Sequence, residues 1–262
     1  MKNSIKLSYC VVTYNSEDKI EKLINNLENV TPQMYTFNIY VVDNCSTDGT
    51  VKKVENKVKE FENIKLIIPD ENKGFGGGNN MVLQYLDSNY HVLVNPDISI
   101  SDSMQIEKMV EYMESNKDVG LLSPKILNVD GTTQKLYKHN PSILDMALRF
   151  ISPKLMRKRQ LWFVHDETGY VKTGLIEHAS GAFMFFRTEI FKEVNGFDER
   201  YFMYVEDADI TREVNKISKA VFYPNAFVTH VWARDSSKKL KYMLMMLNSM
   251  RKYFDKWGWK IW

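Results

Sequence analysis

The carboxylate of Asp97 follows a short apolar run and a proline, a setting in which it could bind a metal ion. Residues 91–94 predict a buried strand, which Pro96 ends because proline has no N–H for a sheet ladder. Asp97 therefore lies just past the carboxyl end of a predicted central strand, where open α/β sheets bind their ligands. Mg²⁺ and Mn²⁺ prefer such oxygen ligands, and the phosphates of a substrate can complete the shell. The alternative is an aspartate that only shapes the turn after the strand.

A second group of carboxylates, Glu206, Asp207 and Asp209, follows the aromatic run 201–205. Asp207 and Asp209 cannot share a helix face, because neighbours on a face are three or four residues apart. One carboxylate could act as a general base while another orients or binds an acceptor. Partial burial beside the aromatic run would raise a carboxylate pKa toward useful values. We favour this catalytic role over the alternative, in which Asp207 only caps the helix predicted near 210–217.

His230 ends the apolar run 226–229 and also lies at a predicted strand end. A neutral imidazole there could complete a metal shell with Asp97. A lone histidine is more often structural, so both roles stay open. The other four histidines have no comparable setting.

Polar residues follow three predicted parallel strands at what should be a single sheet edge. These residues are Thr13, Tyr14, Asn15, Asp43, Asn44, Asn95 and Asp97. Asp43 could accept a hydrogen bond from a pyrimidine ring N–H, and the backbone at Thr13 and Tyr14 could complete a nucleotide pocket. For Asp48 we favour a helix N-cap over a ligand contact.

The glycines of the loop 72–80, Gly74 among them, could let the backbone approach a diphosphate or ribose. Lys73 or Asn79 could add a side-chain contact to the same ligand. The loop is not a P-loop, because the lysine precedes the glycines and no Gly-Lys-Ser/Thr follows. A plain tight loop is the alternative. The loop predicts the start of a helix that carries Val82 and Leu86.

Strands and helices alternate at short intervals around these residues. Apolar runs predict strands at 7–13, 37–42, 64–68 and 177–187, with short strands near 221 and 227. Helical spacing predicts helices from about 16, through 51–58 and at 103–115. Such alternation implies right-handed βαβ units and an α/β fold with a mostly parallel sheet flanked by helices. Residues 135–170 are less regular and read as a partly helical insertion.

Composition limits the class of protein. A length of 262 residues suits one domain with an insertion, and a net charge of +2 gives no pull toward nucleic acid. Cys10 and Cys45 fall in or beside predicted strands and do not form a disulfide framework, which favours a reducing compartment. We see no signal peptide and no apolar run of membrane-spanning length, so we expect a cytoplasmic protein.

The C-terminal segment 236–262 predicts a basic amphipathic helix that ends in tryptophans. Its apolar stripe comprises Leu240, Met243, Leu244, Leu247, Met250, Phe254 and Trp257. Such a helix suits an anionic membrane surface, where a lipid-linked substrate would be found. Equally, the stripe could pack on the rest of the chain or on a second subunit of a homodimer.

Taken together, these segments resemble the inverting nucleotide-sugar glycosyltransferases of family 2, which have the GT-A fold. The matching segments keep the family's order across nearly the whole chain: Val11-Val12-Thr13-Tyr14-Asn15, Val42 through Gly49, Asn72 through Gly76, Asn95-Pro96-Asp97, Ser180-Gly181-Ala182, and Gly196-Phe197-Asp198-Glu199 through Glu206-Asp207. The Asn-Pro-Asp segment and the ending 253–259 look most like bacterial rhamnosyltransferases of polysaccharide assembly.

The resemblance implies roles for individual residues. Asp43 would read the nucleobase, Asp97 and His230 would hold a divalent cation, and Asp207 would deprotonate the acceptor hydroxyl with Glu206 beside it. Donor contacts would come from Thr13, Tyr14, Asn15, Asp43, Asn44, Lys73, Gly74, Asn79, Asn95 and Asp97, and acceptor contacts from Gly181, Ala182 and Asp209. One departure matters, since Asn95 replaces the first aspartate of the usual Asp-X-Asp motif and a charge is lost there.

The resemblance also implies a domain plan and an activity. A GT-A catalytic domain would span 1–235, with a nucleotide-binding half at 1–100 and an acceptor half at 101–235. We expect a metal-dependent, inverting hexosyltransferase that moves L-rhamnose from dTDP-rhamnose to a saccharide or lipid-linked saccharide. The alternatives are a UDP-hexose or UDP-galactofuranose donor, or a non-catalytic nucleotide-binding protein. A nucleotidyltransferase is disfavoured, because no basic glycine loop follows the first strand.

Overall fold

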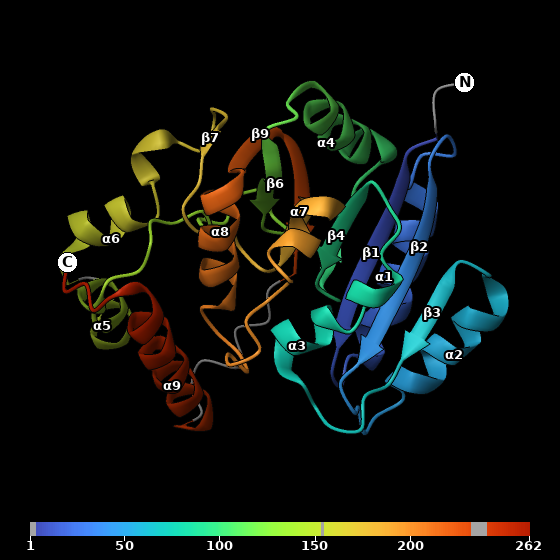
Figure 1. Cartoon of the computed structure of the whole chain (residues 1–262), viewed down its shortest axis with the longest axis horizontal. Helices are drawn as coiled ribbons and strands as arrows, with labels where there is room; N and C mark the ends of the chain where they lie inside the picture. The colour runs from blue at the N-terminus through green and yellow to red at the C-terminus, as the bar shows by residue number, and fades with distance from the viewer. Residues whose placement is uncertain (1–3, 153–154, 232–239) are drawn as a thin grey trace.

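The computed structural model describes residues 4–152, 155–231 and 240–262 of the protein. Its first half alternates strands and helices, as the hydrophobic pattern predicts (Figure 1). The elements are β1 (Lys6–Thr13), α1 (Glu17–Val30), β2 (Thr36–Asp43), α2 (Thr50–Glu60), β3 (Ile64–Ile67) and β4 (Tyr90–Val94). These strands are parallel in the order β3-β2-β1-β4. Thr13 pairs with Asp43, so β1 and β2 end level with each other.

The second half adds antiparallel strands to the same sheet. Its elements are β5 (Ile98–Ser99), α4 (Ser103–Ser115), β6 (Val119–Leu127), β7 (Gly174–Leu175), β8 (Phe183–Arg187), α7 (Thr188–Glu193), α8 (Glu206–Ile217) and β9 (Lys219–His230). The strand order is β3-β2-β1-β4-β8-β6-β9-β5, with β7 paired to β9. The α/β class is confirmed, and the sheet is mixed because β8 runs antiparallel between β4 and β6.

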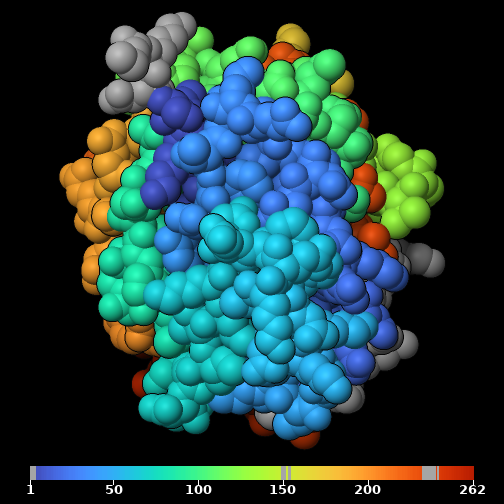
Figure 2. Space-filling model, turned by 90° about the vertical axis from the view of Figure 1, so that its right-hand side faces the viewer, coloured from blue at the N-terminus to red at the C-terminus, as the bar shows by residue number. Residues whose placement is uncertain are grey.

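Two apolar layers cover the faces of the sheet. On one face α1 and α4 contribute residues such as Ile24 and Met109, which are 0% exposed. On the other face α7 and α8 contribute Phe191 and Val214, also 0% exposed. In Figure 2, which looks from the side of β2 and β3, the blue and cyan atoms of the N-terminal half cover most of the visible surface.

Two elements differ from the sequence prediction. The glycines themselves form a helix, α3 (Gly74–Asn80), and only the 3-10 turn η1 (Leu83–Tyr85) follows where a longer helix was predicted. A side chain at Gly74 would collide with the Phe202 carbonyl, and a Cβ on Gly78 would lie 2.8 Å from Val12. Glycine is therefore needed so that this helix can approach β1 and the 202 turn closely.

The strand predicted at 177–187 begins only at Phe183, and residues 177–182 form a loop that reaches α8. The predicted short strands near 221 and 227 are one strand, β9, with an irregular register opposite Pro124 and Lys125. A register irregularity keeps both halves of β9 paired with β6 across the kink.

The insertion is partly helical, as expected. It carries α5 (Ile143–Ile151), α6 (Arg157–Phe163) and the 3-10 turn η2 (Asp166–Thr168). Ser142 and Asp145 form a capping box at the start of α5. Arg159 of α6 binds the Asp145 carboxylate at 2.6 Å and so joins the two helices.

The C-terminal helix α9 (Leu240–Trp257) is present, and the predicted domain boundary at 235–236 lies outside the described residues. Its second half packs on the body of the protein, where Tyr253 and Phe254 are buried against Tyr201 and Ala208. Among the described residues, no helix is both long enough and apolar enough to cross a bilayer.

Candidate active site

The pairing of β4 with β8 brings Asp207 to the sheet edge at which Asn95 and Asp97 lie. Just past the paired residues, the Asn95 N–H donates to the Ala182 carbonyl at 3.0 Å. The preceding residue, Gly181, donates its N–H to Asp207 Oδ2 at 3.3 Å. Segments distant in the sequence therefore meet here, while their roles in chemistry stay predictions.

Asp97 and His230 face each other across 3.2 Å, from Oδ1 to Nε2, because β5 pairs with the end of β9. Lys19 of α1 places its Nζ 3.4 Å from the other carboxylate oxygen. Burial would raise the pKa of Asp97, but the hydrogen bond and charge of His230 and the Lys19 ammonium outweigh it, so the net pKa is lowered. Such a carboxylate stays charged at neutral pH. A carboxylate beside an imidazole is a donor set that fits Mn²⁺ or Mg²⁺, with open positions for substrate oxygens.

Asp207 has a histidine partner that the sequence did not reveal. His178 Nε2 lies 3.1 Å from Asp207 Oδ1. Burial would raise the pKa of Asp207, but the charge and hydrogen bond of His178, the charge of Lys138 and the Gly181 N–H lower it strongly. The first turn of α8 also favours a negative charge. Proximity of His178 to the Ser180-Gly181-Ala182 segment was the only available signal.

Glu206 is adjacent to Asp207 but differs from it in charge state. The residue is 7% exposed, and within the described part of the chain its Oε2 has no hydrogen-bond partner. Burial, and next the charge of Asp207, raise the pKa of Glu206. Glu206 is held toward its neutral form, whereas Asp207 is charged and can accept a proton, so Asp207 stays the candidate for the base. Its lowered pKa is opposite to the raised pKa expected from the sequence, because His178, Lys138 and the Gly181 N–H outweigh burial.

The turn that leads into α8 is strained. Tyr204 and Val205 have φ values of 74° and 60°, which β-branched residues such as valine rarely adopt. Neighbours hold the turn on two sides, because Phe75 N–H donates to the Phe202 carbonyl at 3.2 Å and Ser249 Oγ donates to the Met203 carbonyl at 2.7 Å. Strain of this kind persists only where the surroundings enforce it.

Asp209, predicted to contact an acceptor, is buried between α8 and α9. It is 1% exposed, and its carboxylate accepts hydrogen bonds from Lys256 Nζ at 2.8 Å and from Trp257 Nε1 at 2.6 Å. Tyr201 adds a third contact at 3.2 Å. The residue therefore joins α8 to α9, and its acceptor contact stays a prediction. Gly181 and Ala182 do lie beside Asp207, and their acceptor contacts stay predictions.

At the nucleotide end, Asp43 is buried and holds its own loop. Its two oxygens accept hydrogen bonds from the Ser46 N–H at 2.8 Å and the Ser46 hydroxyl at 2.7 Å. Each oxygen keeps a second lone pair, so nucleobase recognition by Asp43 stays a prediction. The neighbouring Thr13 Oγ1 is buried without a partner among the described residues, and Tyr14 is 54% exposed.

Two further predicted residues have structural contacts. Asn15 has a positive φ of 48°, and its Oδ1 accepts from the Thr47 N–H at 2.8 Å. Asp48 accepts from the Thr50 N–H at 3.0 Å, but the N-cap of α2 is Gly49, so the predicted N-cap position is wrong by one residue. Asn15 therefore ties the β1 loop to the β2 loop.

The glycine loop is shaped by packing. Asn44 donates to the Gly74 carbonyl at 2.8 Å and accepts from the Lys73 N–H at 3.2 Å. Gly74 is buried under Phe202, and Asn79 is 1% exposed with its amide bonded to the Phe75 carbonyl, while their donor contacts stay predictions. Lys73 Nζ pairs with the exposed carboxylate of Glu71 at 2.7 Å, and the predicted contact of Lys73 with the donor stays a prediction.

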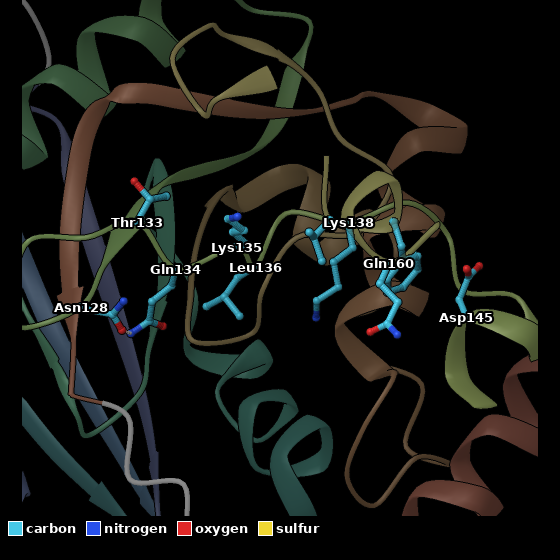
Figure 3. Close-up of a pocket in the computed structure, with 10 residues that line it drawn as sticks. Asn128, Thr133, Gln134, Lys135, Leu136, Lys138, Asp145 and Gln160 are labelled. Carbon is cyan, nitrogen blue, oxygen red and sulfur yellow. Dashed lines mark hydrogen bonds between the residues drawn. The ribbon is translucent and has the colours of Figure 1, made fainter. Parts of the chain in front are cut away.

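A cavity of about 350 Å³ lies between the insertion and the end of β6 (Figure 3). Such a volume lies within the range of about 300–1,000 Å³ for small-molecule sites. Gln134 and Gln160 lie on opposite sides of it, and Leu136 adds an apolar wall. Lys138 also lines it and carries the charge that lowers the pKa of Asp207. Lys138 therefore connects this cavity with the surroundings of Asp207.

Comparison with known proteins assigns the class. The fold is that of GT-A glycosyltransferases, and a model described as glycosyl transferase family 2 matches residues 8–194. The chain belongs to glycosyl transferase family 2. It is 25% identical over 245 residues to the N-acetylglucosaminyl-diphospho-decaprenol L-rhamnosyltransferase of Mycobacterium tuberculosis, covering 88% of this chain and 78% of that protein. It is 26% identical over 228 residues to rhamnosyltransferase WbbL of Escherichia coli, covering 83% and 80%.

Solved structures agree on the fold. TarS 1-349 of S. aureus superposes with a TM-score of 0.60 at 21% identity, covering 87% of this chain and 60% of that chain. The chain thus spans three fifths of that structure. The mannosyltransferase PcManGT from Pyrobaculum calidifontis, in complex with GDP-Man and Mn²⁺, superposes with a TM-score of 0.62 at 18% identity, covering 87% and 57%.

Proposed function

We propose that the protein transfers a sugar, with inversion, from a nucleoside diphosphate donor to a saccharide or lipid-linked saccharide in surface polysaccharide synthesis. Two observations support the proposal: Asp97 faces His230, and Asp207 binds the N–H of Gly181, whose neighbour Ala182 accepts a hydrogen bond from Asn95. L-Rhamnose from dTDP-rhamnose is the donor we favour, because two relatives are named rhamnosyltransferases. A UDP-hexose is the alternative, since a TarS structure holds UDP-GlcNAc.

Asp97 and His230 are the residues that would hold a divalent cation. The carboxylate and imidazole of this pair fit such an ion, and the structures of PcManGT and GalNAc-T7 contain Mn²⁺. A bound Mg²⁺ or Mn²⁺ would neutralise negative charge that develops on the departing diphosphate. Lys19, beside Asp97, supplies a further positive charge at this end of the site.

Asp207 is the residue that would accept the proton of the acceptor hydroxyl. The hydroxyl oxygen forms a bond to the anomeric carbon while the bond from that carbon to the diphosphate breaks, so the configuration inverts. His178 and the Gly181 N–H orient the carboxylate and keep it charged before the acceptor arrives. General-base catalysis of this kind contributes roughly 10²- to 10⁴-fold.

The acceptor would approach from the side of the insertion, where the cavity is lined by Lys138 and by Gln134, which contacts His230. We place the protein in the cytoplasm, since its two cysteines, Cys10 and Cys45, are free thiols. We further propose that the exposed end of α9 rests on the membrane surface, which would bring a lipid-linked acceptor to the cavity.

A panel of nucleotide sugars tests the proposal directly. The full chain is incubated with Mn²⁺, each donor and a lipid-linked saccharide, and release of the nucleoside diphosphate is measured together with the product. We expect turnover with dTDP-rhamnose, and loss of metal-dependent donor binding in Asp97→Ala. Turnover with a UDP-hexose alone would establish the alternative donor. Nucleotide binding without transfer on any donor would point to a non-catalytic binding protein.

A further inference from the structure

We propose that Gln134 is a positioning residue that fixes the ring of His230 so that Nε2 is presented to the cation site beside Asp97. The inference rests on the proposed function, because it concerns the residues that would hold the cation. Gln134 is 6% exposed and comes from the segment that follows β6, far from His230 in the sequence.

Gln134 contacts His230 at two points. Its Oε1 lies 3.0 Å from His230 Nδ1, and its Nε2 donates to the His230 carbonyl at 2.9 Å. The imidazole and the backbone of one residue are therefore held by one side-chain amide. Figure 3 shows Gln134 beside Asn128 at the wall of the cavity.

A chain of hydrogen bonds determines which way the Gln134 amide points. Gln134 Nε2 also donates to Asn128 Oδ1 at 2.9 Å. Asn128 is oriented in turn, because its Nδ2 donates to Thr132 Oγ1 at 2.8 Å while that hydroxyl donates to Asp130 at 2.6 Å. With two acceptors around Nε2, Oε1 must face His230. An amide oxygen only accepts hydrogen bonds, so the hydrogen between them is on His230 Nδ1.

The consequence for the site is geometric. The hydrogen on Nδ1 leaves His230 Nε2 as the nitrogen that faces Asp97 Oδ1 at 3.2 Å. The ring cannot rotate without breaking its bond to Gln134. Metal-binding histidines are commonly oriented in this way through their second nitrogen, and losing that partner typically weakens metal affinity by roughly 10- to 100-fold.

A role of the Gln134 side chain in stabilising its own segment can be tested apart from its role in orienting the His230 ring. The Gln134 backbone N–H already donates to the Ile126 carbonyl at 2.8 Å and so anchors the segment. The chain also offers a matched control in Gln105, which is 3% exposed and accepts from the Phe227 N–H at 3.1 Å on the same strand, β9. Within the described part of the chain, the Gln105 side chain hydrogen-bonds Asp102 and Phe227, so it supports the strand without reaching the imidazole.

The first experiment is a Mn²⁺ titration of the full chain, with free Mn²⁺ followed by its paramagnetic resonance signal. Gln134→Met should weaken Mn²⁺ binding roughly 10- to 100-fold, and Gln134→Glu, which keeps an acceptor oxygen, should recover part of that loss. Gln105→Met should bind Mn²⁺ as the wild type does, whatever its stability. Equal Mn²⁺ affinity in Gln134→Met and wild type would overturn the inference.

The second experiment needs no metal. A ¹H–¹⁵N correlation spectrum of the wild-type histidines, assigned by the loss of one ring in His230→Gln, reports which nitrogen carries hydrogen. We expect hydrogen on Nδ1 of His230. A ring with bare Nδ1 would overturn the role of Gln134. Failure of the wild type to bind Mn²⁺, with Nδ1 protonated, would instead count against the proposed cation site.

Discussion

At the scale of single residues, Asp207 is the group on which transfer should depend. Asp207→Asn keeps the size and the hydrogen-bonding position beside His178 but removes the basic oxygen. We expect transfer to fall by roughly 10²- to 10⁴-fold, the usual contribution of a general base. Donor affinity, measured by calorimetry, should stay close to that of the wild type. An Asp207→Asn variant with wild-type turnover would remove Asp207 from the mechanism.

Glu206 leads to a prediction about pH. Burial and the charge of Asp207 raise the pKa of Glu206 in the folded state above its value in the unfolded chain, about 4.3. Stability from this group is complete below the unfolded pKa and is lost as the pH rises toward the folded pKa. Glu206→Gln is neutral at every pH, so it should gain stability relative to wild type on going from about pH 4 to about pH 8.

Thermal unfolding at several pH values measures this gain. Glu62→Gln is the control, because Glu62 is exposed and its change should leave the pH dependence as in the wild type. Parallel curves for wild type and Glu206→Gln would mean that Glu206 is not held toward its neutral form.

At the scale of elements, the glycine helix α3 supports the turn before α8. Gly74→Ala should destabilise the protein for two reasons, the φ of +72° and the collision with the Phe202 carbonyl. Gly131→Ala is a matched control, because Gly131 has a φ of +82° with nothing within 4 Å of an added Cβ. The control should cost about 1 kcal/mol, and Gly74→Ala clearly more. Urea unfolding gives both values, and equal costs would show that the contact with Phe202 is unimportant.

The joint between α8 and α9 is held by charge at one residue. Lys256 Nζ lies 2.8 Å from Asp209, 2.9 Å from Glu213 and 3.2 Å from Asp198. Lys256→Met leaves the buried Asp209 carboxylate without its ammonium, so we expect a loss of about 3 kcal/mol in the free energy of unfolding. Adding Asp209→Asn should restore part of it.

Lys117→Met is the control for that joint. Lys117 pairs with Glu114 at 2.9 Å, but its side chain is 65% exposed, and exposed pairs contribute less than about 1 kcal/mol. A loss as small for Lys256→Met as for Lys117→Met would mean that packing of Tyr253 and Phe254 is enough to hold α9 in place.

At the scale of the whole molecule, the sequence predicts the first half of the fold well. Each parallel strand there is a short apolar run, and each helix has a clear apolar face. The antiparallel place of β8 was not predictable, because pairing partners depend on contacts between segments far apart. The glycine helix was missed for a related reason, since Phe202 and Val12 make glycine necessary at α3.

The candidate site was likewise predictable only where local sequence determines it, and not where distant segments meet. The sequence singles out Asp97, His230 and Asp207 because each stands at a predicted strand or helix end, and the structure pairs Asp97 with His230. The contacts of Asp209 could not be predicted from its neighbours in sequence, since Lys256 and Trp257 come from the far end of the chain. His178 and Gln134 were missed, because their importance lies in contacts with residues on other elements.

The two halves of α9 differ in exposure, and each fits one of the two roles predicted for its apolar stripe. The second half packs on the body, as Tyr253 and Phe254 show, whereas Leu240, Leu244 and Leu247 in the first half are 66%, 56% and 46% exposed. These exposed leucines follow one helical face at i, i+4 and i+7, the arrangement with which amphipathic helices enter a membrane interface.

We therefore expect the full chain to float with liposomes that contain anionic lipid, and the Leu244→Glu/Leu247→Glu variant to stay in the soluble fraction. Val129→Glu/Val171→Glu is the matched control, because both valines are exposed, at 73% and 65%, on other parts of the surface. It should float like the wild type. If the wild type does not float but forms a dimer that the leucine variant abolishes, the exposed face is a contact between two copies of the chain. In that case the membrane role of α9 is wrong, while the proposed transfer chemistry at Asp207 is untouched.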